Sequence, residues 1–169
     1  MVFIILFMGS LYSVLTPDPE QILDELEKFQ GGIADTSTLI YLNRINLLPW
    51  VSKFLKLLVT PEVVCEFGRP PAGCILCGET CVGGADQAVL QLATKLWLPV
   101  LSEDRQLLMS SRDLGLKYYN TLMILLALLH QQKLSLAEYQ RAYSSLRKIA
   151  RYSPAVWQVG EQVFSLYVR

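Results

Sequence analysis

The chain has 169 residues, the size of about one domain, and its 15 Lys and Arg residues balance its 15 Asp and Glu residues. Hydrophobic residues make up 52% and charged residues 18%, which excludes a disordered tail, a highly basic nucleic-acid coat protein and a disulfide-scaffold miniprotein. No apolar run reaches the roughly 20 residues that span a bilayer, so we expect no membrane span. The high apolar content favours an interface, and a homodimer is expected.

The charge is unevenly distributed along the chain. Residues 1–27 carry five acids and no base, whereas residues 105–151 carry eight bases and two acids. A basic half is compatible with binding a polyanion, and it is equally compatible with the solvated faces of amphipathic helices. The apolar segment 1–15 has the length of a secretion signal but lacks its positive start. A buried strand, a partner-facing element or an added upstream stretch are its alternatives.

The predicted elements alternate between helices and strands. Helices are expected over 17–29 (ended by Gly31-Gly32), 39–48 (ended by Pro49), from 61 onward, and over 85–96, 105–113, 121–132, 136–149 and 155–168. Short apolar strands are expected at 33–34, 55–59, 97–101 and 116–119, and a loop rich in Gly, Pro and Cys at 68–84.

Strands that alternate with helices predict a parallel sheet covered on both faces, and hence an α/β fold with three α/β/α layers. We expect an N-terminal extension over 1–30, a core over 31–135, and C-terminal helices over 136–169 that pack on the core.

Four acids occupy positions where such a sheet binds ligands. Asp35 and Asp104 follow predicted strands, and Glu66 and Asp86 lie in helices that follow a strand or a loop. Ligands of open parallel sheets bind beyond the carboxyl ends of the strands, so the four carboxylates can meet there. They would repel one another unless a cation neutralised them, and oxygen ligands suit Mg²⁺ or Mn²⁺. Such a cluster can activate water for phosphodiester hydrolysis. In the alternative reading, each acid caps a helix or pairs with a base.

Five segments between Gly32 and Leu134 resemble the PIN-domain nucleases, a family that includes the toxins of prokaryotic toxin–antitoxin pairs. In the order of the family pattern they are IADTSTLIYLNRINLL, VTPEVVCEF, GGADQAVLQLA, VLSEDRQLL and LGLKYYNTLMILLALLHQQKLS. The resemblance implies an α/β/α sandwich with a parallel sheet and a metal-dependent ribonuclease site.

The resemblance also implies the roles of single residues. The acids that match the family pattern, as catalytic and metal-binding groups for Mg²⁺ or Mn²⁺, are Asp35, Glu66, Asp86 and Asp104. The expected substrate contacts are Ser37, Arg105 and Asn120, the last standing where the family usually has Gly. RNA is the implied partner, an antitoxin protein is a second one, and the cytoplasm is the implied location. A PIN fold that binds RNA or protein with weakened catalysis is the alternative.

The cysteines support a separate hypothesis. Four of them fall within a short segment, at Cys65, Cys74, Cys77 and Cys81, and could hold a structural metal as four thiolates. Free loop thiols are the other interpretation. The single histidine, His130, lies near the end of an apolar helix, where we expect it to pack or to cap the helix.

Overall fold

A computed structural model describes residues 18–168, which form two compact units. Residues 30–121 form the sheet unit, and residues 18–29 and 122–168 form the helical unit. The interpretations of segment 1–15 fall outside the described residues. None of the helices within residues 18–168 combines the length and the apolar character that crossing a membrane requires.

The sheet unit is built on five parallel strands in the order β3-β2-β1-β4-β5. The strands are β1 (Gly31–Ala34), β2 (Lys56–Val59), β3 (Ile75–Leu76), β4 (Val100–Leu101) and β5 (Tyr118–Tyr119). The chain runs outward from β1 through β2 to β3, crosses back to β4 and continues to β5. The direction of travel therefore reverses at the neighbouring strands β1 and β4.

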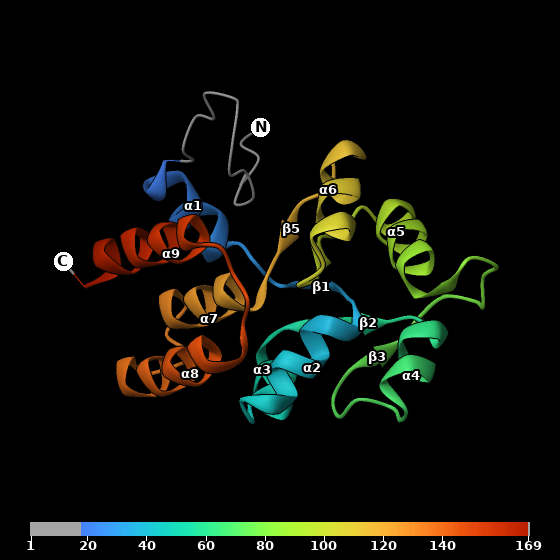
Figure 1. Cartoon of the computed structure of the whole chain (residues 1–169), viewed down its shortest axis with the longest axis horizontal. Helices are drawn as coiled ribbons and strands as arrows, with labels where there is room; N and C mark the ends of the chain where they lie inside the picture. Colours follow the sequence, from blue (N-terminus) through green and yellow to red (C-terminus); the bar gives the residue numbers. More distant parts are fainter. Residues whose placement is uncertain (1–17, 169) are drawn as a thin grey trace. The chain divides into compact units, whose positions relative to one another are not determined.

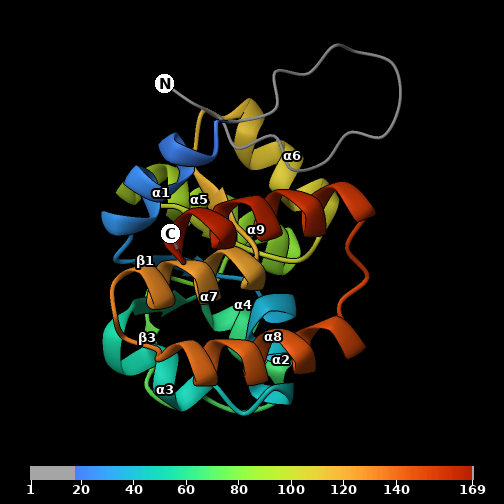
Figure 2. The same cartoon turned by 90° about the vertical axis from the view of Figure 1, so that its left-hand side faces the viewer.

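Helices cover both faces of this sheet. The helices of the sheet unit are α2 (Thr36–Arg44), α3 (Leu48–Phe54), α4 (Pro61–Phe67), α5 (Gly84–Leu96) and α6 (Arg105–Asp113). Because crossovers between parallel strands are right-handed, the reversal at β1 and β4 moves α5 and α6 to the face opposite α2, α3 and α4. Both views show this separation within the unit (Figures 1 and 2). The predicted α/β fold with three layers is confirmed.

Two glycines begin β1 instead of ending the preceding helix, contrary to the sequence prediction. A Cβ atom on Gly31 would overlap the backbone of Lys56 in β2, and one on Gly32 would overlap the carbonyl of Pro99 before β4. The backbones of the central strands pass too close together here for any larger residue. The glycines are thus required for packing within the sheet. They do not end α1, which already ends at Glu27.

Two other predicted boundaries are wrong. The predicted helix 39–48 ends earlier, because α2 ends at Arg44 and the chain turns at Asn46, whose φ is 58°. Pro49 does not end this helix but lies in the first turn of the next one, α3. Pro is favoured in the first turn of a helix because a backbone N–H at that position has no hydrogen-bond acceptor within the helix. The short edge strand β3 lies inside the predicted loop 68–84. Its two residues, Ile75 and Leu76, are both exposed, so the sequence has no alternation of buried apolar and exposed polar residues from which the strand could be predicted. The other predicted elements are confirmed with small shifts at their ends.

The helical unit contains α1 (Pro19–Glu27), α7 (Thr121–His130), α8 (Leu136–Ile149) and α9 (Pro154–Tyr167). Helix α1 packs against α9, and the Gln131 amide donates hydrogen bonds of 2.8 Å to the carbonyls of Leu26 and Phe29. Gly160 of α9 lies against the Leu122 side chain of α7. Helix α7 therefore belongs with α1 and the C-terminal helices, whereas the sequence-based division assigns it to the core.

Candidate acidic site at the sheet edge

Asp35 lies directly beyond the carboxyl end of β1 and is 5% exposed. It is the N-cap of α2, and its carboxylate accepts a hydrogen bond of 3.3 Å from the Ser37 backbone N–H. The Ser37 hydroxyl donates to the same oxygen at 2.6 Å, and the Ser102 hydroxyl donates to it at 3.0 Å. Hydrogen bonds to an ionised acceptor are the strong ones, so this buried carboxylate is held in a fixed orientation.

Ser102 connects Asp35 to the segment that follows β4. Its hydroxyl accepts a hydrogen bond of 2.9 Å from the Asp104 backbone N–H while it donates to Asp35. The Asp104 carboxylate caps α6 by accepting from the Leu107 N–H at 2.9 Å. Asp35 and Asp104 therefore follow β1 and β4, the neighbouring strands from which the sheet extends in opposite directions. This topological switch point is where open α/β sheets bind ligands.

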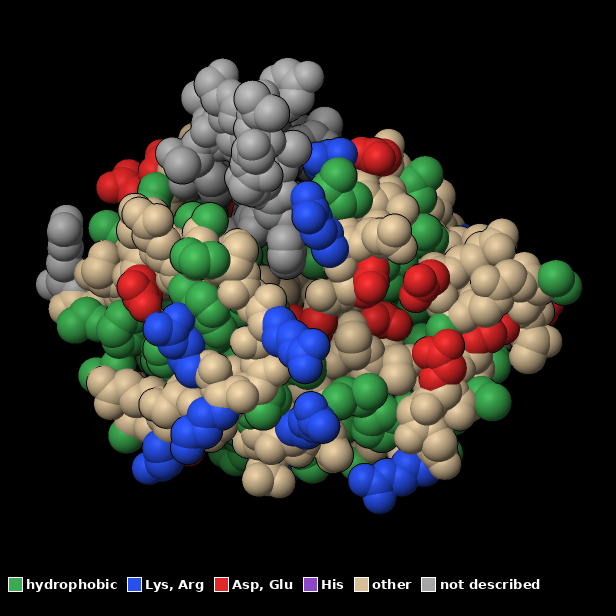
Figure 3. Space-filling model, viewed as in Figure 1, with side chains coloured by type: hydrophobic (Ala, Val, Ile, Leu, Met, Phe, Trp, Pro, Cys, Tyr) green, Lys and Arg blue, Asp and Glu red, His purple; other side chains and the backbone are tan. Residues whose placement is uncertain are grey.

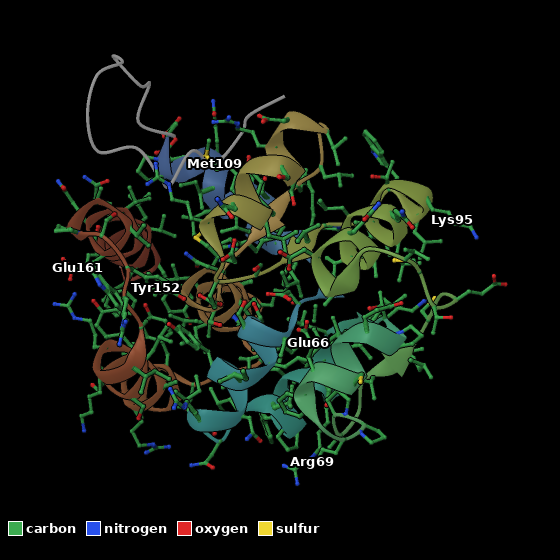
Figure 4. All side chains as sticks on the ribbon, turned by 45° about the vertical axis from the view of Figure 1, so that its right-hand side comes forward. Glu66, Arg69, Lys95, Met109, Tyr152 and Glu161 are labelled. Atoms are coloured by element: carbon green, nitrogen blue, oxygen red, sulfur yellow. The ribbon has the colours of Figure 1, made fainter. Side chains whose placement is uncertain are left out.

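Glu66 approaches the same edge from α4. Its carboxylate accepts a hydrogen bond of 2.8 Å from the hydroxyl of Thr36, the residue next to Asp35. Figure 4 shows Glu66 on the side of α4 toward α2, whereas Arg69 lies at the outer end of that helix. Helices α2 and α4 pack against each other, which positions the carboxylate beside the start of α2.

Asp86, in the first turn of α5, is the fourth predicted acid. Its side chain is exposed overall, but partial desolvation raises the pKa of its carboxyl, and the negative charges of Asp35, Asp104 and Glu66 raise this pKa further. Acidic side chains gather where α5 and α4 meet on the face shown in Figure 3. Asp86 thus lies near enough to each of the other three predicted acids to interact with it electrostatically, although the four come from separate segments.

The donor set fits a hard cation. All four groups are carboxylates, the ligand type that Mg²⁺ and Mn²⁺ prefer, and the mutual repulsion felt at Asp86 is what a cation would relieve. Within residues 18–168, no three His, Cys, Asp or Glu side chains are close enough as they stand to hold one ion together. Binding an ion through three protein ligands would therefore require the exposed acids to move inward.

Glu103 is a site residue that the sequence reasoning missed. Its carboxylate accepts hydrogen bonds from the Thr121 N–H at 2.8 Å, the Thr121 hydroxyl at 2.6 Å and the Thr38 hydroxyl at 3.2 Å. Its own N–H donates to the Ser37 hydroxyl at 2.9 Å. Glu103 thereby fastens the end of β4 to α2 and to the residues after β5. The only sequence signal was a second acid immediately before Asp104.

The three predicted substrate contacts differ in how accessible they are. Ser37 already donates to Asp35, and Arg105 is exposed in the first turn of α6. Asn120 is 3% exposed beyond β5, so a substrate could reach it only if its surroundings moved. Its contact with a substrate stays a prediction that burial does not favour.

The four cysteines are free thiols. Cys65 is exposed on α4, and Cys74, Cys77 and Cys81 are partly buried in the segment that surrounds β3. Burial raises the pKa of the Cys74 thiol to about 11, which disfavours the thiolate that a metal would need. In the part of the chain that the structure describes, these cysteines do not gather into a group that could hold a metal. His130 makes an edge-on ring contact with Tyr167 in the helical unit.

Comparison of the chain with protein-family models, with curated proteins and with solved structures finds no match in any of the three. The resemblance to PIN-domain nucleases therefore stays a prediction, and the acidic site itself is what supports a function.

Proposed function

We propose that the protein is a divalent-metal-dependent endoribonuclease that hydrolyses phosphodiester bonds in single-stranded RNA. The observation that carries the proposal is the buried, hydrogen-bonded Asp35 at the switch point of the sheet, with three further carboxylates in its electrostatic neighbourhood. An isolated helix-capping acid would not need donors from two different strand ends. A carboxylate that is fixed in this way supports a role in holding a cation.

Some residues of the site would hold the metal ion, and others position the groups that hold it. Asp35, Glu66, Asp86 and Asp104 would hold Mg²⁺ or Mn²⁺. When bound, the ion would supply charge for the phosphate and an activated water. Ser37 and Ser102 keep the Asp35 carboxylate oriented, so that it does not have to be ordered when substrate arrives. Arg105, exposed beside the site, would neutralise a phosphate of the bound strand.

The test compares the wild-type protein with Asp35→Asn on a labelled single-stranded RNA in the presence of Mn²⁺. Since outer partners of metal ligands already contribute about 10–100-fold to activity, removal of a ligand should lower cleavage by at least about 100-fold. Asp113→Asn is the matched control, because Asp113 is exposed, pairs with Arg112 at 2.8 Å and lies at the end of α6. Equal cleavage by wild type and Asp35→Asn would reject the assignment.

A second candidate is a PIN-like fold that binds RNA or a protein without catalysing cleavage. It is favoured by the spacing of the acids, since no three acidic or other ligand side chains within residues 18–168 can share an ion as they stand. Calorimetric titration with Mn²⁺ separates the two functions. Binding that Asp35→Asn abolishes supports the nuclease, whereas no binding by wild type supports the non-catalytic module.

The partners follow from the proposed activity. RNA is the proposed substrate and the cytoplasm is the proposed location. The resemblance adds an antitoxin protein as a partner, and the high apolar content adds a second copy of the chain. Ile75 and Leu76, which are both exposed on the edge strand β3, support an interface at this edge of the sheet. Light scattering of the purified protein would give its oligomeric state directly.

A further inference from the structure

A second concave feature of the sheet unit lies beyond the carboxyl ends of β2 and β3. It is a pocket of about 530 Å³ between the segment that follows β3 and one side of α5. That volume is within the range of roughly 300–1,000 Å³ found for small-molecule sites, and it is large enough for a nucleobase. None of the four predicted acids lines it.

The pocket adjoins the acidic site through the sheet. Thr60, which lines the pocket, follows β2 as Asp35 follows β1. The register that pairs Ile33 with Leu58 places Thr60 beside Asp35 when it is extended by two residues. Neighbouring strands are about 4.8 Å apart, so the pocket begins one strand away from the buried carboxylate. A chain whose phosphate met Asp35 would thus have its next base near this pocket.

The outer wall of the pocket is held in place. The Cys81 N–H donates a hydrogen bond of 2.6 Å to the Glu62 carboxylate of α4. This contact lowers the pKa of Glu62 and keeps that carboxylate charged. Gly78 has a φ of 91°, a conformation that favours glycine, and it faces Leu92 of α5 across an ordinary van der Waals distance. The hydrogen bond at Cys81 therefore holds this wall in place.

The lining combines an apolar part with polar and charged groups. Ala88 and Leu92 of α5 provide the apolar surface, and Gln91 and Lys95 of the same helix add an amide and a cation. The opposite wall carries the Glu79 carboxylate. Figure 4 shows Lys95 on α5, apart from Glu66 of the acidic site.

We propose that this pocket binds a guanine base of single-stranded RNA, next to the phosphate at the acidic site. Guanine carries the N1–H and amino donors that a carboxylate such as Glu79 accepts, and the O6 and N7 acceptors that Lys95 can meet. Proteins recognise single-stranded RNA through such exposed base edges. This inference names the substrate class of the acidic site. Cleavage of the bound RNA depends on the proposed function, whereas binding of guanine in the pocket does not.

Binding by the full-length Asp35→Asn protein tests the pocket without cleavage. The probes are oligoadenylates of equal length that carry one central guanosine, one central inosine or neither. We expect the guanosine oligomer to bind about ten-fold more tightly than plain oligoadenylate, with inosine intermediate because it lacks the amino group. Adding Glu79→Ala should abolish this preference, whereas Glu20→Ala, an exposed glutamate of α1, should leave it unchanged. Lys95→Ala should reduce it.

The outcomes separate this inference from the proposed function. A guanosine preference that Glu79→Ala removes supports the pocket even if the wild-type protein never cleaves RNA. Equal affinity for the three oligomers, or a preference that survives both Glu79→Ala and Lys95→Ala, overturns the pocket even if the wild-type protein is an active nuclease. All the substituted side chains of the pocket lie at its exposed rim, so the variants are expected to fold.

Discussion

Replacing Ser102 by Ala tests whether the hydroxyl network holds the acidic site together. Ser102 is fully buried, and its hydroxyl serves two partners at once, the Asp35 carboxylate and the Asp104 N–H. Hydrogen bonds to charged groups contribute about 1.5–3 kcal/mol, and an unsatisfied buried N–H costs about 1–3 kcal/mol. Because Ser37 still donates to Asp35, the losses do not simply add. We expect Ser102→Ala to lower the free energy of unfolding by about 2–4 kcal/mol.

Urea unfolding followed by circular dichroism measures this loss, with tryptophan fluorescence as a second probe for two-state behaviour. For a slope of about 2 kcal/mol per molar urea, the midpoint should fall by about 1–2 M. Ser110→Ala is the control, since Ser110 is exposed on α6 in the same unit and its loss should change stability by no more than about 0.5 kcal/mol. The same midpoint for both variants would show that the network contributes nothing to the fold.

Two further predictions concern packing and the thiols. Gly32→Ala should cost about 3 kcal/mol, because the new Cβ would overlap the Pro99 carbonyl and neither backbone can yield, whereas Gly68→Ala, in open space with a φ of 81°, should cost about 1 kcal/mol. Thermal melts should rank the two in that order, and an equal loss would contradict the close approach of β1 and β4. Cys74, with its pKa near 11, should react with iodoacetamide at pH 8 far more slowly than exposed Cys65, and its reactivity should rise as the pH approaches 11. Equal rates at pH 8, measured by peptide mass spectrometry, would exclude the burial that raises this pKa.

The strand ends were predictable because they depend on local sequence. Asp35 and Asp104 each follow a short apolar run and precede a helical pattern, which places them at the carboxyl ends of parallel strands whatever the details of packing. The convergence of Glu66 and Asp86 needed more than local signals. The expected parallel sheet allowed them to reach the same edge and the resemblance implied their roles there, and the effect of the charges of Asp35, Asp104 and Glu66 on the pKa of Asp86 agrees with this prediction.

Features set by tertiary packing were not predictable from the sequence. The role of Glu103 depends on Thr38 and Thr121, which belong to other segments and carry no pattern that links them to it. The glycines of β1 read as a helix end because their close neighbours, Lys56 and Pro99, lie far away in the sequence. In each case a contact between distant segments decided the local structure.

The acidic site owes its geometry to hydroxyl groups as much as to carboxylates. Each of the two serine hydroxyls donates to Asp35 and accepts a backbone N–H from the segment after β4, Ser37 from Glu103 and Ser102 from Asp104. The two donations satisfy a charge that is almost completely removed from water, and the two acceptances fix where α6 begins. Moving Asp35 would therefore also disturb the position of Asp104. Because the hydrogen bonds of the two serines already fix Asp35, binding of a cation would require the exposed acids Glu66 and Asp86 to move toward it.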